Sequence, residues 1–169
     1  MRVRYAQQPL EKSIFLAGPS PRKPKLGQRP TPSWRPHACV LLEKLKFDGL
    51  VLVPEPVDFM FEEGDFDRDV QVSWEWEGLN QATVVVFWVP RNIETLPGFT
   101  TNVEFGNLVA SGKVLLGYPA GAPKVEYLEQ MARRYRLRVY HSLDEILAEA
   151  VRRTKCLFGM EDRATAPAP

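Results

Sequence analysis

Two apolar runs, VVVFWV (84–89) and VLLGY (114–118), flank the segment PGFTTNVEFGNLVASGK (97–113). Both runs are short, rich in Val and Leu, and free of polar alternation, which is typical of strands buried on both faces of a parallel sheet. The segment between them opens with a Pro-Gly turn signal, and we predict a helix over 101–110. Because ligands collect where loops leave the carboxyl ends of parallel strands, Glu104 in the first turn of this helix becomes a candidate functional residue.

The same alternation of strand and helix extends along the chain. It predicts an α/β fold, with a five-stranded parallel sheet covered by helices on both faces. We expect one domain over residues 1–158 and a disordered tail over 159–169, where large apolar residues are scarce. The other predicted strands are 13–17, 50–53 and 137–140, and the other predicted helices are 35–46, 70–81, 124–135 and 143–156.

Composition and charge favour a small-molecule partner. The chain has 169 residues, 44% of them hydrophobic, and a net charge of only +1, so no electrostatic signature of nucleic-acid or membrane-surface binding is present. No apolar run approaches the roughly 20 residues that span a bilayer. We therefore expect a cytoplasmic protein that binds neither nucleic acid nor membrane. Cys39 and Cys156 are predicted to be reduced core thiols, and His37 and His141 have no metal-type spacing, so we predict no metal and no cofactor.

Two connections are longer than this fold requires. Residues 18–32 contain five prolines and the basic side chains of Arg22, Lys23, Lys25 and Arg29, whereas residues 54–69 are strongly acidic. Long loops in a compact domain are usually functional lids or disordered segments. Because both loops follow strands, we expect them at the same sheet edge as Glu104.

Glu104 itself has two interpretations. Thr101 and Glu104 have capping-box spacing, in which each side chain accepts a hydrogen bond from the other residue's amide. Alternatively, the positive end of the helix dipole favours an ionised carboxylate, which suits a nucleophile. Spacing alone leaves both interpretations open.

Two further motifs could build a site beside Glu104. In Trp74-Glu75-Trp76-Glu77 the two glutamates point to different faces of a helix, so at most one can face Glu104. The tryptophans could stack on a flat heterocycle or pack in a core or interface. In the second motif, Gly18-Pro19-Ser20-Pro21-Arg22, glycine permits close approach of a ligand, and a hydroxyl and an arginine can hold a phosphate.

The order of these motifs resembles the nucleoside 2-deoxyribosyltransferase family, in particular its deoxyribosyltransferase-like branch. The resemblance spans about residues 13–130 and rests on LAGPS (16–20), WEWEGLNQA (74–82), FWVPR (87–91), TNVEFG (101–106) and SGK (111–113). It implies a flavodoxin-like fold and cleavage of an N-glycosidic bond. Thr83 stands where the family often has aspartate, and residues 98–102 lack the aspartate that deoxyribosyltransferases carry before the nucleophile.

The resemblance also implies roles for individual residues. Glu104 would be the nucleophile and Glu75 the acid or substrate-positioning group. The implied substrate contacts are Gly18, Pro19, Ser20, Arg22, Trp74 and Asn102, with no cofactor. The resemblance further implies a homo-oligomer in which a neighbouring subunit completes the pocket, with Trp74, Trp76 and Trp88 suited to the interface; light scattering tests this expectation.

The leading functional hypothesis is cleavage of a (deoxy)nucleoside or its 5′-monophosphate through a glycosyl-enzyme intermediate on Glu104. A second base as acceptor gives transfer, and water gives hydrolysis. Two alternatives remain: an N-glycohydrolase of NAD or another nucleotide, and a nucleotide-sensing module with weak or no catalysis.

Overall fold

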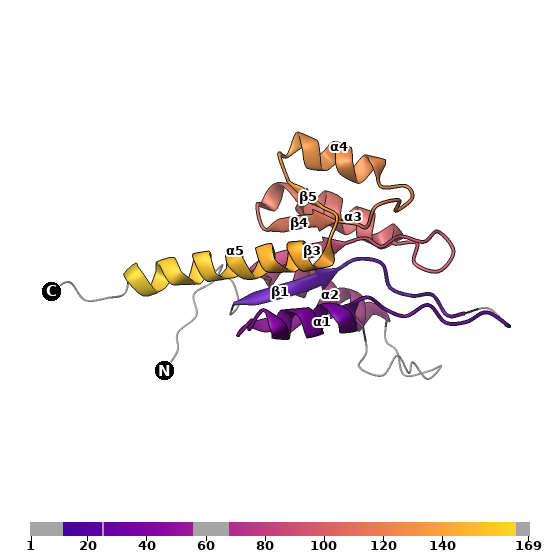
Figure 1. Ribbon diagram of the computed structural model, residues 1–169, viewed down its shortest axis with the longest axis horizontal. Helices are drawn as coiled ribbons and strands as arrows, with labels where there is room; N and C mark the ends of the chain where they lie inside the picture. The colour runs from indigo at the N-terminus through magenta and orange to yellow at the C-terminus, as the bar shows by residue number, and fades with distance from the viewer. Residues whose placement is uncertain (1–11, 25, 56–67, 165–169) are drawn as a thin grey trace.

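The computed structural model describes residues 12–24, 26–55 and 68–164, and its centre is a five-stranded parallel sheet in the order β2-β1-β3-β4-β5 (Figure 1). This topology confirms the predicted α/β, flavodoxin-like fold. In chain order the strands are β1 (Ser13–Ala17), β2 (Leu50–Leu52), β3 (Val84–Trp88), β4 (Val114–Gly117) and β5 (Val139–Tyr140).

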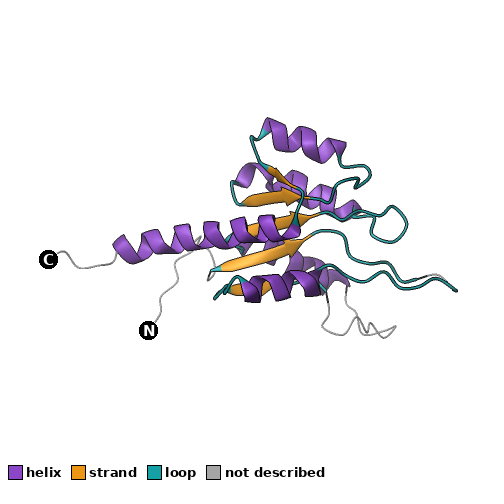
Figure 2. Ribbon diagram, viewed as in Figure 1, coloured by secondary structure: helices purple, strands orange, loops and turns teal. Residues whose placement is uncertain are grey.

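Helices cover both faces of the sheet (Figure 2). Along β1, Phe15 and Ala17 face one core, and Ile14 and Leu16 face the other, which explains why the strand sequences lack polar alternation. One face carries α1 (Arg35–Lys44) and α5 (Leu143–Ala164); the other carries α2 (Arg68–Gln81), α3 (Phe99–Leu108), which continues into the 3-10 turn η1 (Val109–Ser111), and α4 (Glu126–Arg134).

Several element boundaries differ from the sequence predictions. Helix α5 continues to Ala164, past its predicted end at Cys156. Cys156 is an exposed free thiol on that helix, so its predicted core position is wrong, whereas Cys39 is a partly buried free thiol. Most of the predicted acidic loop, residues 56–67, and the end of the predicted tail, residues 165–169, lie outside the described residues. Within the described ranges, no helix is long and apolar enough to cross a membrane.

Glycines bring three elements together around the carboxyl end of β1. A Cβ on Gly18, whose φ is 148°, would lie 2.1 Å from the Trp88 carbonyl oxygen, so only glycine permits this approach of the β1 loop to β3. A Cβ on Gly78 would lie 2.7 Å from the Phe15 ring, so α2 packs closely over β1. Glu75, one turn before Gly78, is thereby placed over the carboxyl end of β1.

The strand order reverses between β1 and β3, and the helices that follow these strands, α1 and α3, cover opposite faces of the sheet (Figure 2). Such a switch point is where open α/β sheets bind ligands. Thr83, which stands where the family that the sequence resembles often has aspartate, lies at the opposite edge of the sheet. There Ser13 N–H donates to Thr83 Oγ1 (3.2 Å) and Thr83 N–H donates to Ser13 Oγ (3.1 Å). Thr83 therefore joins the starts of β1 and β3 and is remote from the switch point.

Candidate active site

Two adjoining cavities lie at the switch point. The acidic cavity has a volume of about 270 Å³, and its lining includes Gly18, Pro19, Ser20, Arg22, Glu75 and Glu104. The apolar cavity has a volume of about 460 Å³, and its lining includes Val72, Trp76, Val103 and Leu108. Both cavities share Glu75, Leu79, Thr100 and Glu104, so the two glutamates stand at the boundary between them.

The start of α3 determines where Glu104 points. Gly98 adopts a left-handed conformation (φ 62°) and is the N-cap, so α3 begins at Phe99, two residues earlier than predicted. Thr101 therefore lies inside the helix and is 1% exposed, so the capping-box interpretation of Thr101 and Glu104 is wrong. The hydroxyl of Thr100, one turn before Glu104, donates to the Glu104 carboxylate instead. The carboxylate is turned to the two cavities.

The charge state of Glu104 differs from the sequence expectation. Burial, followed by the nearby charge of Glu75, raises the pKa of Glu104 to about 7, while Arg35 and the Thr100 hydroxyl act in the opposite direction. The helix dipole was expected to keep this group ionised, but that effect fades beyond the first turn, and Glu104 is the sixth residue of α3. The Glu104 carboxyl therefore holds its proton to a much higher pH than an ordinary glutamate.

Arg35 is a site residue that the sequence analysis missed. It is only 1% exposed, and its guanidinium organises the loop after β1 from beneath the acidic cavity, which it also lines. It donates to the carbonyl oxygens of Leu16 (2.9 Å), Gly18 (2.7 Å) and Pro19 (3.4 Å) and to Ser20 Oγ (3.1 Å).

Glu55, three residues after the end of β2, is the counterion of Arg35. The two side chains form an ion pair in which the Glu55 side chain is 6% exposed, and Ser33 Oγ donates to the other Glu55 oxygen (2.7 Å). Burial lowers the pKa of Arg35, and the Glu55 charge opposes this effect. The buried Arg35–Glu55 ion pair therefore connects α1, the loop after β1 and the segment after β2. The signal for Arg35 in the sequence was a basic residue at a helix start, directly before Pro36.

The structure separates the four residues of the Trp74–Glu77 motif. Glu75 lines both cavities and accepts a hydrogen bond from Gln71 Nε2 (2.7 Å), whereas the Glu77 carboxylate pairs with Gln81 on the exposed face. Trp76, and not Trp74, lines the apolar cavity; the Trp74 ring lies 6.0 Å from that of Phe15. Only one glutamate faces Glu104, as the helical spacing predicts.

Asn102 and Trp88 also occupy positions other than those expected. The Asn102 side chain accepts a hydrogen bond from Arg91 Nη2 (2.6 Å) and is not among the residues that line the two cavities. Trp88 is 6% exposed in the core, so it is not available for an interface, whereas Trp76 is 55% exposed. The homo-oligomer itself stays a prediction. Among the described residues, no cluster of three His, Cys, Asp or Glu side chains could hold a metal ion.

The raised pKa of Glu104 predicts a pH-dependent stability difference. Between about pH 4.5 and about pH 7 the unfolded chain has lost the Glu104 proton while the folded chain retains it, so wild-type stability falls as pH rises across this window and levels off above it. Glu104→Gln removes this titration. We expect the variant to gain up to about 3 kcal/mol of unfolding free energy relative to wild type between pH 4.5 and 8, measured by urea denaturation at each pH.

The exposed glutamate of the same acidic motif supplies the control for this experiment. Glu77→Gln removes a carboxylate outside both cavities, so its stability difference from wild type should change much less with pH. A Glu104→Gln difference that is constant across the same pH range would contradict a raised pKa at Glu104.

Fold and site together define a class: a flavodoxin-like α/β domain with a carboxylate pair in a small-molecule cavity at the β1/β3 switch point. The protein family described as nucleoside 2-deoxyribosyltransferase like matches residues 11–122, and the chain belongs to this family. A search of curated proteins finds no match. The matched region runs from β1 to β4 and includes Glu75 and Glu104. Membership confirms the family resemblance and supports a transferase or glycosidase type of enzyme with a nucleoside substrate.

Proposed function

We propose that the protein cleaves the N-glycosidic bond of a (deoxy)nucleoside or its 5′-phosphate, with Glu104 as the nucleophile. The observation that carries this proposal is the position of the Glu104 and Glu75 carboxyl groups at the boundary of an acidic and an apolar cavity. A base fits the apolar cavity beside Trp76, and a sugar fits the acidic cavity beside Gly18 and Ser20. The bond between base and sugar would then lie at the two carboxyl groups.

The first step follows the logic of retaining glycoside cleavage. The Glu104 carboxylate attacks the anomeric carbon, the C–N bond breaks, and its electron pair leaves with the base. The pair reacts in the form in which Glu104 is ionised and its one shared proton is on Glu75, and this proton passes to the leaving base. The product is a glycosyl ester on Glu104 and an ionised Glu75.

The second step regenerates both side chains. A second base or a water molecule attacks the anomeric carbon of the ester, and Glu75 accepts the proton that this nucleophile loses. The ester bond breaks and releases the Glu104 carboxylate. A base as acceptor gives transfer, and water gives hydrolysis.

Arg35 supports this chemistry without contact with the reacting atoms. Its hydrogen bonds to Gly18, Pro19 and Ser20 hold the wall of the acidic cavity at a fixed distance from Glu104. Its positive charge also favours the ionised form of Glu104, which is the reactive form.

A substrate panel tests the proposal. The protein is incubated with deoxynucleosides, their 5′-monophosphates and NAD, with and without a second free base, and the released base is separated and quantified. Release without an acceptor indicates a hydrolase, base exchange indicates a transferase, and NAD cleavage indicates the glycohydrolase alternative. Binding without turnover across the panel would contradict the proposal and support a nucleotide-sensing module. The absence of an aspartate in residues 98–102 is the sequence feature that favours this alternative.

A further inference from the structure

A third cavity, of about 320 Å³, shares Arg22 with the acidic cavity and shares no lining residue with the apolar cavity. We call it the basic cavity, because Arg22, Lys23 and Arg29 line it together with Thr31, Glu94 and Thr95. It lies between the connection formed by residues 18–32, which we call the 18–32 arm, and the loop after β3. Both leave the same edge of the sheet (Figure 1). Arg22 lines the acidic cavity as well and is the residue that the two cavities share.

Arg22 is held at this junction by two contacts. Its backbone N–H donates to the Thr95 carbonyl oxygen (2.9 Å), which joins the arm to the loop after β3. Its guanidinium carbon lies 5.4 Å from the centroid of the Phe99 ring, at the mouth of the acidic cavity. Contact with an aromatic face leaves the in-plane N–H groups of an arginine able to bind an anion.

The charge of the basic cavity favours an anion. Three cationic side chains line it against one carboxylate, that of Glu94, although the whole chain has a net charge of only +1. Within the described part of the chain, neither Lys23 nor Arg29 forms an ion pair. Arg35, by contrast, is neutralised by Glu55. Uncompensated cations that converge on one cavity are suited to phosphate groups.

Shared lining residues order the three cavities along one path, from apolar to acidic to basic. The apolar and acidic cavities meet at Glu75 and Glu104, and the acidic and basic cavities meet at Arg22. A nucleotide laid along this path has its base in the apolar cavity, its sugar in the acidic cavity and its 5′ end at Arg22. Because Arg22 is the residue that both cavities share, a single 5′-phosphate would contact Arg22, and further phosphates would extend toward Lys23 and Arg29.

We infer that the basic cavity binds the outer phosphates of a pyrophosphate-containing nucleotide, either a nucleoside 5′-di- or triphosphate or a dinucleotide joined by a pyrophosphate. The inference rests on the proposed function for the identity of the rest of the substrate. The anion site itself rests only on the lining of the basic cavity.

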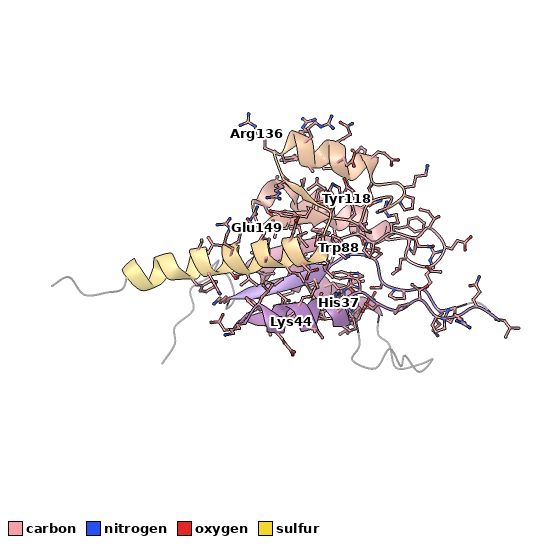
Figure 3. All side chains as sticks on the ribbon, in the orientation of Figure 1. His37, Lys44, Trp88, Tyr118, Arg136 and Glu149 are labelled. Atoms are coloured by element: carbon pink, nitrogen blue, oxygen red, sulfur yellow. The ribbon has the colours of Figure 1, made fainter. Side chains whose placement is uncertain are left out.

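The anion site is tested by calorimetric titration with inorganic tripolyphosphate, which requires no catalysis. We expect wild type to bind it, with affinity that falls as salt concentration rises, and Lys23→Ala/Arg29→Ala to lose about tenfold or more in affinity. The matched control is Lys44→Ala/Arg134→Ala, which removes one lysine and one arginine from the last turns of α1 and α4. Figure 3 places Lys44 on α1, away from the 18–32 arm. Equal loss in the two double variants, or no binding by wild type, overturns the site.

The substrate class is tested by base release from deoxyadenosine, dAMP, dATP and NAD. We expect kcat/KM of wild type to be higher for dATP or NAD than for dAMP, and the ratio to dAMP to fall about tenfold in Lys23→Ala/Arg29→Ala. Whichever of dATP and NAD has the higher kcat/KM shows whether the bound pyrophosphate belongs to a nucleoside triphosphate or to a dinucleotide. Equal kcat/KM for dAMP, dATP and NAD overturns the inference and leaves the proposed function intact. Tripolyphosphate binding without turnover of any compound leaves the anion site intact and overturns the proposed function.

Discussion

Glu104→Ala is expected to reduce base release by at least about a thousandfold, because a covalent nucleophile acts in the transition state and its removal leaves only substrate binding and positioning. The substrate is the most active member of the nucleoside and nucleotide panel, and the measurement is kcat/KM from steady-state kinetics. Loss of the carboxylate should lower kcat far more than it changes KM. A variant with wild-type kcat would end the assignment of Glu104 as the nucleophile.

Two controls separate lost chemistry from lost structure. Glu104→Ala should be at least as resistant to urea as wild type above pH 7, since it no longer holds a partly buried carboxylate whose pKa is raised to about 7. Glu77→Ala removes an exposed carboxylate from α2, outside the two cavities, and should retain most of the activity. Mass spectrometry of acid-quenched wild type after incubation with substrate should detect the glycosyl adduct on Glu104, and an adduct on another residue would relocate the site.

The sheet could be predicted from the sequence because buried parallel strands leave a direct compositional mark. The run 84–89 has no polar residue, and β3 is buried on both faces. Its Val85 and Phe87 side chains pack into one core, and its Val84 and Val86 side chains pack into the other. Helix ends were less predictable. The start of α3 depends on the left-handed conformation of Gly98, and nothing in the spacing of Thr101 and Glu104 reveals it.

The position of Glu104 could be predicted, but its charge state could not. Its place after β3 follows from the strand-helix-strand pattern, whereas its pKa depends on burial and on Glu75, which α2 brings from another part of the chain. Helical spacing correctly limited the partner to one of Glu75 and Glu77. It could not decide between Trp74 and Trp76, because both lie in the same helix and the choice depends on how α2 packs over β1 at Gly78.

The sequence marks Arg35 as a basic residue at a helix start, but it does not identify Glu55 as the partner of Arg35. The two residues are separated by 20 positions, and Glu55 lies in a loop in which acidic residues are common. Only the folded chain places Glu55 beside Arg35, since β1 and β2 are adjacent in the sheet and bring their following loops together. The pair lies below the cavity wall, so it links stability to the geometry of the site.

Arg35→Ala is therefore expected to destabilise the fold by about 3–5 kcal/mol, the typical cost of removing one partner from a buried ion pair. Glu55 would remain as an unpaired buried charge, and the carbonyl oxygens of Leu16 and Gly18 would lose their donor. Urea denaturation at pH 7 measures the change. Arg35→Met/Glu55→Met, which removes both charges and retains apolar volume, should recover part of this loss.

Two comparisons make the Arg35 prediction specific. Arg152→Ala breaks an ion pair with Glu149 in which the arginine side chain is 63% exposed, and it should change stability little because solvent screens that pair. If the double methionine variant recovers stability but not activity, Arg35 also positions the Gly18–Ser20 wall, since methionine cannot donate to the carbonyl oxygens that shape it. Equal effects of Arg35→Ala and Arg152→Ala on unfolding would mean that the buried pair does not hold the loop, and the positioning role of Arg35 would fall with it.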